Sequence, residues 1–197
     1  MRKRLSSLLL MGTTIMGSIT ASAMLAQGTP APPKYPLDVT LTYNGTLSNA
    51  ITSSHFWMQG GGIQLHGQFG RGFGVVADIA GMHQGNISSS GVGLDMVTAT
   101  FGPRYTWSPA HRKFAVFGHV LAGEAHGFQG VFPSISGPNS SDDSLALQMG
   151  GGVNLALSRR IGVRAIEADW LRTQLPNGTT NVQNNFRIGA GIAFQLN

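Results

Sequence analysis

The C-terminal stretch, Asn185–Asn197, constrains the fold most, because its apolar side chains recur at every second position. This parity holds Phe186, Ile188, Ala190, Ile192, Phe194 and Leu196. A period of two is the pattern of a β-strand with two different faces. The other face is mostly glycine and alanine, with Arg187 and Gln195. Such a face fits the crowded inside of a small barrel whose outside faces lipid.

Seven further stretches repeat this alternation. In one of them, Ile63 and Leu65 alternate with Gln64 and His66. The predicted strands before the C-terminal one are 37–43, 56–69, 73–82, 95–105, 114–125, 145–157 and 161–171. Each can supply the roughly nine to eleven residues that a tilted membrane strand needs. The sequence therefore predicts an all-β fold, an eight-stranded antiparallel up-and-down transmembrane β-barrel over residues 37–197.

The connections between these strands alternate between short and long. The short ones are 70–72, 106–113 and 158–160, and the long ones are 44–55, 83–94, 127–144 and 172–184. Outer-membrane barrels have short periplasmic turns and longer external loops. Each long connection holds an Asn-x-Ser/Thr triplet, beginning at Asn44, Asn86, Asn139 and Asn177. These triplets are either glycosylation sites of a secreted protein or chance products of polar loops, and we favour chance.

The composition excludes several classes of protein. Only 11% of the residues are charged, yet no apolar run is long enough for a confident transmembrane helix. The absence of cysteine excludes disulfides, Cys–zinc sites and a lipid-modified N-terminal cysteine. The formal charge is +5, but outside the N-terminus the basic residues are scattered, which argues against a nucleic-acid partner.

The N-terminus has the pattern of an export signal. Arg2, Lys3 and Arg4 precede an apolar segment over 5–19, and Ala21-Ser22-Ala23 matches a cleavage site. Residues 1–23 are therefore predicted to be a signal peptide. Residues 24–36 are predicted to be a proline-rich linker.

Aromatic residues gather near the predicted strand ends, as in the girdles that flank a membrane barrel. They are Tyr43, Phe56, Trp57, Phe69, Phe73, Tyr105, Trp107, Phe114, Trp170, Phe186 and Phe194.

With its signal peptide, eight amphipathic strands and closing R-I-G-A-G-I-A-F, the chain resembles the small outer-membrane β-barrel family, the OmpA-like transmembrane domain. The resemblance implies a porin-like cell-envelope protein of the Gram-negative outer membrane, in contact with lipid and inserted by the barrel assembly machinery. Two features depart from the family. The last aromatic residue, Phe194, is displaced inward from the C-terminus, and no peptidoglycan-binding domain follows the barrel. A role in anchoring the cell wall is therefore not implied.

Charged residues are densest in the seventh predicted strand. Strict alternation would set Glu167 and Asp169 on the face opposite Arg164, towards lipid, where a charge is costly. A β-bulge at Ala165–Ile166 would turn all three inward. Antiparallel pairing about a loop centred near Gly178 then sets Asp169 opposite Arg187.

We predict an interior polar network of six residues: Asp78, Arg104, Arg164, Glu167, Asp169 and Arg187. It is either a proton- or ion-handling site or an ion network that fills a narrow lumen. We favour the second, because an eight-stranded barrel is packed with side chains.

No catalytic, cofactor-binding or metal-binding residue is predicted. The six histidines lack the spacing of metal ligands, and Ser53, Ser54 and His55 are weak evidence for a hydrolase. The triplets Gly60–Gly62 and Gly150–Gly152 lack the lysine and helix of a phosphate loop, so they indicate close packing in a barrel wall.

The predicted function is that of a non-catalytic outer-membrane protein with a structural or surface-interaction role, whose loop partner the sequence does not name. The alternatives are a secreted lipocalin-like ligand-binding barrel and a lipid-acting barrel hydrolase. Face polarity separates the first alternative, since a soluble barrel puts its large apolar residues inside.

Overall fold

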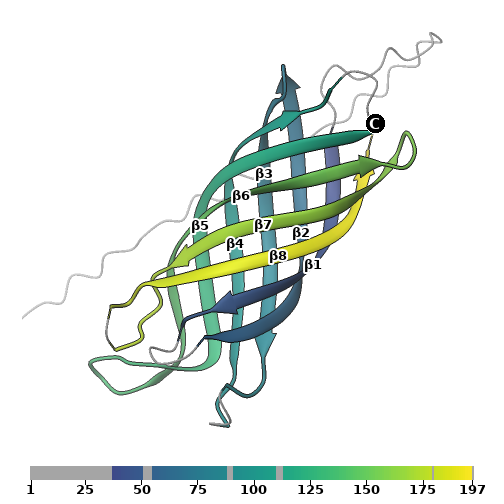
Figure 1. The fold of residues 1–197 in the computed structure, drawn as a ribbon. Helices are drawn as coiled ribbons and strands as arrows, with labels where there is room; N and C mark the ends of the chain where they lie inside the picture. Colours follow the sequence, from purple (N-terminus) through teal and green to yellow (C-terminus); the bar gives the residue numbers. More distant parts are fainter. Residues whose placement is uncertain (1–36, 51–54, 88–90, 110–112, 179, 197) are drawn as a thin grey trace, which may run out of the picture. The chain divides into compact units, whose positions relative to one another are not determined.

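The computed structural model describes residues 37–50, 55–87, 91–109, 113–178 and 180–196, which form a closed eight-stranded antiparallel barrel (Figure 1). Every strand pairs with its neighbours in sequence, and β8 closes on β1. The strands are β1 (Leu37–Ser48), β2 (Phe56–Gly70), β3 (Phe73–Gln84), β4 (Leu94–Trp107), β5 (Phe114–Phe132), β6 (Asn139–Ala156), β7 (Ile161–Thr173) and β8 (Gln183–Gln195). The predicted signal peptide and linker lie outside the described residues.

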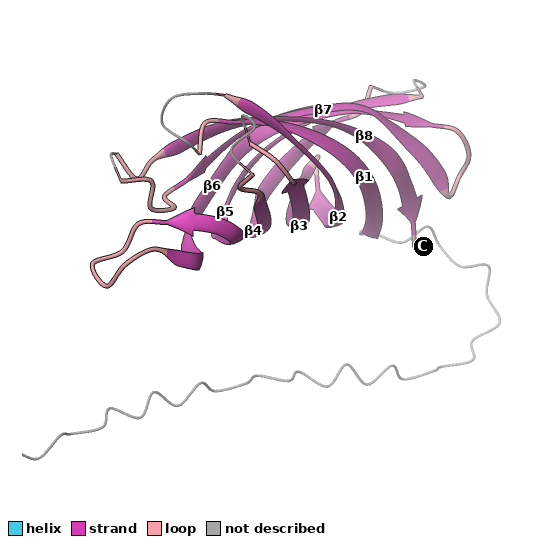
Figure 2. Ribbon diagram, turned by 90° about the horizontal axis from the view of Figure 1, so that it is seen from below, coloured by secondary structure: helices cyan, strands magenta, loops and turns pink. Residues whose placement is uncertain are grey.

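Strands and connecting loops account for all of the described structure (Figure 2). Among these residues there is no helix long and apolar enough to cross a membrane.

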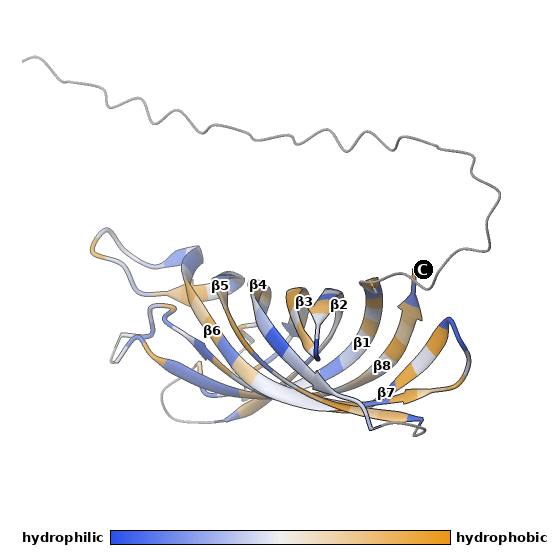
Figure 3. Cartoon of the chain, turned by 90° about the horizontal axis from the view of Figure 1, so that it is seen from above, coloured by the Kyte–Doolittle hydropathy of each residue, from blue (hydrophilic) through white to orange (hydrophobic). Residues whose placement is uncertain are grey.

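The two faces of the barrel wall have the polarity that the alternation predicts. Along β2, Gln64 is 1% exposed while its neighbours Ile63 and Leu65 are 45% and 46% exposed. Figure 3 shows polar and apolar bands following one another along several of the strands. Large apolar residues of the alternating strands are 38–53% exposed on the outer face: Ile63, Val97, Leu147, Met149, Ile188 and Ile192. A soluble barrel of lipocalin type would hold these side chains inside, so the face polarity contradicts that alternative.

Several strands run further than predicted, and the long loops are correspondingly shorter. β5 and β6 continue to Phe132 and from Asn139, so their connection is 133–138 rather than 127–144. Backbone pairing persists there because ladder hydrogen bonds do not depend on apolar alternation. Asn44 and Asn139 therefore lie within strands, and the assignment of their triplets to loops was wrong.

The predicted bulge in β7 is present. Arg164 pairs with Gly191, whereas Glu167 pairs with Gly189, so two residues of β7 oppose one of β8. Ala165 and Ile166 are both exposed. The bulge leaves Arg164, Glu167 and Asp169 buried on the inner face.

Most of the predicted aromatic residues lie on the outer face near strand ends. Phe69, Phe73, Tyr105 and Trp107 lie at the end where the connections are 71–72, 108–113 and 157–160, here called the turn end. Trp57, Trp170 and Phe186 lie at the opposite, loop end. Phe56 is an exception, because Trp57 takes the outward parity and leaves Phe56 only 7% exposed inside the barrel.

The lumen is layered along its axis. An apolar cluster fills the loop end: Phe56, Met58, Met82, Ile87, Leu94, Met96, Ala125, Phe132, Ala146, Leu171 and Leu175. Charged and amide side chains fill the middle, and a cavity opens at the turn end.

Candidate functional site

Arg187 lies at the centre of the charged middle layer. It is 2% exposed and pairs in register with Asp169 on the neighbouring strand, as predicted. Its Nε and Nη2 donate to Asp169 Oδ2 at 3.1 Å and 2.8 Å. Nη2 also donates to Asp78 Oδ2 at 2.5 Å, from β8 to β3. One guanidinium therefore holds two carboxylates, one beside it and one on a strand that it does not pair with.

Arg164 forms a second centre closer to the turn end. Its Nη1 donates to Glu167 Oε2 at 3.0 Å and also to Gln64 Oε1. Its Nη2 donates to Thr40 Oγ1 at 3.2 Å, and its Nε to Asn154 Oδ1 at 3.1 Å. The guanidinium is fully buried, so these bonds replace its water shell.

Two glutamines join the centres. Gln64 Nε2 donates to Glu167 Oε1 at 2.7 Å and reaches Asp78 Oδ2 at 3.4 Å. Gln148 Nε2 donates to Asp78 Oδ2 at 3.0 Å and to Asp169 Oδ2 at 3.2 Å. Because each amide bonds to carboxylates on separate strands, the network ties the barrel wall together across its width.

His119 belongs to this network, although the sequence did not single it out. Its Nε2 lies 2.9 Å from Asp169 Oδ1, and its side chain is fully buried. Its parity within β5 could have placed it inward. The contact with Asp169 follows from the register of three successive strands, because His119 and Asp169 both pair with Gly150 of β6.

Arg104 is buried like the other five predicted residues but does not join them. Its Cζ lies 3.7 Å from the centroid of the Phe117 ring, and that of Arg164 lies 4.6 Å from the same centroid. Among the described residues, Arg104 makes no ion pair, and its Nε and Nη1 have no hydrogen-bond partner. It faces the turn-end cavity instead.

The middle layer is close to electrically balanced, and its carboxylates are already paired with arginines. Three carboxylates, Asp78, Glu167 and Asp169, face the two guanidinium groups of Arg164 and Arg187. Donor atoms of His119, Glu167 and Asp169 lie within 4.8 Å of one another, a spacing that could hold a metal ion. The two arginines already bind those carboxylates and repel a cation, so the arrangement fits an ion network that fills the lumen.

The described residues show no catalytic arrangement that would support the weak hydrolase hypothesis. Ser53 and Ser54 lie outside the described residues, and His55 is exposed at the start of β2.

Comparison with known proteins identifies the architecture. No protein-family model and no curated protein sequence matches the chain. Among solved structures, Neisserial surface protein A (NspA) is similar with a TM-score of 0.60 and 12% identity, over 81% of this chain and 97% of NspA. Yersinia pestis Ail, the attachment invasion locus protein, solved with the heparin analogue sucrose octasulfate, is similar with a TM-score of 0.52 and 18% identity, over 82% of this chain and 99% of Ail.

The likeness extends over nearly the full length of both barrels, and at these identities it concerns the fold. An exposed apolar belt of this kind is suited to contact with hydrocarbon rather than with water. The chain is an eight-stranded β-barrel of the small outer-membrane type, with the fold of NspA and Ail.

Proposed function

We propose that the chain is a non-catalytic bacterial outer-membrane barrel with a structural or surface-interaction role. The observation that carries this proposal is the inverted polarity of the wall. Outward residues such as Ile63, Val97 and Met149 are apolar and exposed, whereas inward Arg164 and Arg187 are ion-paired and buried.

The filled lumen argues against a porin. The ion network and the apolar cluster of the loop end occupy successive layers of the interior. A water-filled path through the barrel would have to displace both. The same burial argues against catalysis in the network, because Asp169 and Glu167 are held by arginines rather than beside an activated nucleophile.

The loop end is the part of the barrel that faces outward from the cell in this proposal. β5 and β6 are the longest strands, and the loop 133–138 joins them at this end. Half-buried Asp142 and exposed Asp143 lie near this loop. Asp143 contacts His126, while Asp142 adds negative charge at this end, which disfavours a sulfated ligand such as the heparin analogue solved with Ail.

Fractionation after expression in a Gram-negative host tests the proposal. The full chain should appear in outer-membrane fractions, need detergent for extraction, and shift its gel mobility on heating because the barrel unfolds only then. N-terminal sequencing of the exported protein should begin at Met24, since residues 1–23 act as the signal. A chain that begins at Met24 should stay in the cytoplasm. Soluble, monodisperse exported protein in the absence of detergent would contradict membrane residence.

A further inference from the structure

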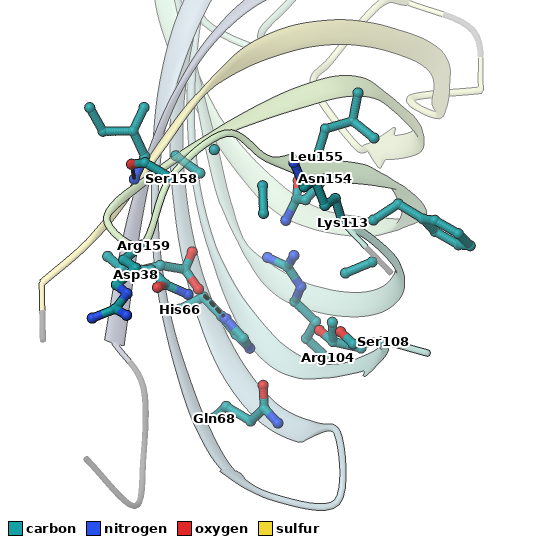
Figure 4. A pocket seen from close by; sticks show the side chains of 18 residues that line it. Asp38, His66, Gln68, Arg104, Ser108, Lys113, Asn154, Leu155, Ser158 and Arg159 are labelled. Atoms are coloured by element: carbon teal, nitrogen blue, oxygen red, sulfur yellow. Dashed lines mark hydrogen bonds and ion pairs between the residues drawn. The ribbon is translucent and has the colours of Figure 1, made fainter. Parts of the chain in front are cut away.

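The turn end of the lumen holds a cavity of about 290 Å³ that the proposed function does not use. Residues of β1, β2, β4, β5, β6, β7 and β8 line it, and Asn154, which lines it, accepts a hydrogen bond from the buried Arg164. Figure 4 shows Arg104 and His66 reaching into this space from different strands. A volume of this size accommodates a small ligand rather than a polymer.

Arg104 supplies unused donors to the cavity. It is 2% exposed, and its Nε and Nη1 lack hydrogen-bond partners among the described residues. Contact of its guanidinium with the Phe117 ring fixes its position without satisfying these N–H groups. Buried cationic donors without an anion are costly, and an arginine fork matches an oxyanion.

Residues of β1 and β2 supply unused acceptors to the cavity. His66 Nδ1 lies 2.7 Å from Asp38 Oδ2, and its N–H donates a hydrogen bond to that carboxylate. In the neutral imidazole this leaves Nε2 as a lone-pair acceptor. Neither His66 Nε2 nor Asp38 Oδ1 has a partner in the described part of the chain. A ligand with hydroxyl groups would satisfy both.

Gly74 lies between the strands of His66 and Arg104. It faces inward on β3, in register with Arg104, one strand away from His66. A Cβ at this position would lie 2.5 Å from the Gly67 carbonyl oxygen and 2.6 Å from His66 Nε2. The His66 and Arg104 side chains start about 10 Å apart, two strand spacings, and the absence of a side chain at Gly74 leaves room for the His66 ring between them.

The mouth of the cavity is basic. Lys113 and Arg159 line it, are exposed, and make no ion pair with another described residue. Together with Arg104 they outnumber the single lining carboxylate, Asp38, so the field at the mouth attracts anions.

We propose that this cavity binds a small hydroxylated anion of the glycerol phosphate class. Its oxyanion is held by Arg104, and its hydroxyl groups donate to His66 Nε2 and Asp38 Oδ1. The same chemistry occurs in free glycerol phosphate and in a phosphatidylglycerol headgroup. The site goes beyond the proposed surface role and does not depend on it.

Arginine-selective ¹⁵N spectra of the purified barrel in a zwitterionic detergent test the site. The Nε–H signal of Arg104, assigned by its loss in Arg104→Met, should shift saturably with sn-glycerol 3-phosphate at constant ionic strength. We expect a dissociation constant on the order of 1 mM. Inorganic phosphate should bind several-fold more weakly, and glycerol should not bind. Fractionation tests membrane residence separately, so a negative binding result leaves the membrane assignment untouched.

Site variants and measurements in lipid nanodiscs distinguish specific binding from nonspecific ion screening. Arg104→Met should weaken binding, measured by calorimetry, roughly tenfold or more, because a charged hydrogen-bonding group is lost. Gly74→Ala should weaken it by displacing His66, while Arg71→Met, at an exposed turn outside the lining, should not. Nanodiscs containing phosphatidylglycerol that reproduce the Arg104 shift without added ligand would identify the lipid headgroup as the source. An unshifted Arg104 signal with both sources, or equal loss in Arg71→Met, would overturn the proposal.

Discussion

Arg187 on β8 donates to Asp78 on β3 across the lumen at 2.5 Å, although the two residues are 109 positions apart in the sequence. Two strands, β1 and β2, separate them around the barrel wall. The same guanidinium group holds Asp169 on the adjacent strand. Arg187 therefore connects the β7–β8 pair to β3. Its removal leaves two buried carboxylates without their arginine partner.

Removing Arg187 should destabilise the barrel more than removing one of its partners. Arg187→Met leaves Asp78 without an ion-pair partner among the described residues and Asp169 with only His119, and loss of one member of a buried pair typically costs about 3–5 kcal/mol. Asp169→Asn should cost less, because Arg187 keeps Asp78. In a double-mutant cycle by urea unfolding in detergent, the double variant should lose less than the sum of the single variants. Coupling near zero would mean that the pair is not formed in the folded barrel.

A charge on the outer face should be costly only within the hydrocarbon. Ile188, near the middle of β8, is exposed, and Ile188→Arg should destabilise the barrel by about 2–4 kcal/mol in lipid vesicles. Leu157 is also exposed but lies just beyond β6 at the turn end, so Leu157→Arg should change stability by only about 0–1 kcal/mol. Equal effects at the two positions would contradict the proposed membrane boundaries.

Planar-bilayer recordings should show no large, stable conductance, because the interior is filled. The double variant Asp78→Asn with Arg187→Met should stay closed as well, since the apolar cluster around Met58, Met96 and Phe132 still blocks the loop end. Open-channel steps of porin size in the unmodified protein would show that these layers move apart in the membrane.

Glycines of β6 that lie against the ion network should not tolerate a side chain. A Cβ at Gly150 would collide with the Asp169 carboxylate and the Ala168 carbonyl, so Gly150→Ala should destabilise by about 1–3 kcal/mol. Gly81 on β3 has open space at the same atom, and Gly81→Ala should be neutral or slightly stabilising, because alanine suits a strand interior better. Urea midpoints of the two variants, compared with the unmodified barrel, check this contrast.

The sequence alone determined which face of each strand is apolar, because side chains alternate strictly along a strand. That rule placed Ile63 and Val97 outside and Gln64 inside. It also located the β7 bulge, since Arg164 and Asp169 could share a face only if alternation was broken between them. The pairing of Asp169 with Arg187 followed from a single loop joining adjacent strands.

Only the tertiary structure decided the contacts between strands that are not neighbours. The Arg187–Asp78 contact depends on how the sheet curves back on itself, which alternation along one strand does not specify. The His119–Asp169 contact and the separation of Arg104 from the other charged residues depend instead on the register between successive strands, which sets the height of each side chain in the barrel. Sequence pattern sets the polarity of each surface, and strand register and barrel closure set which buried groups meet.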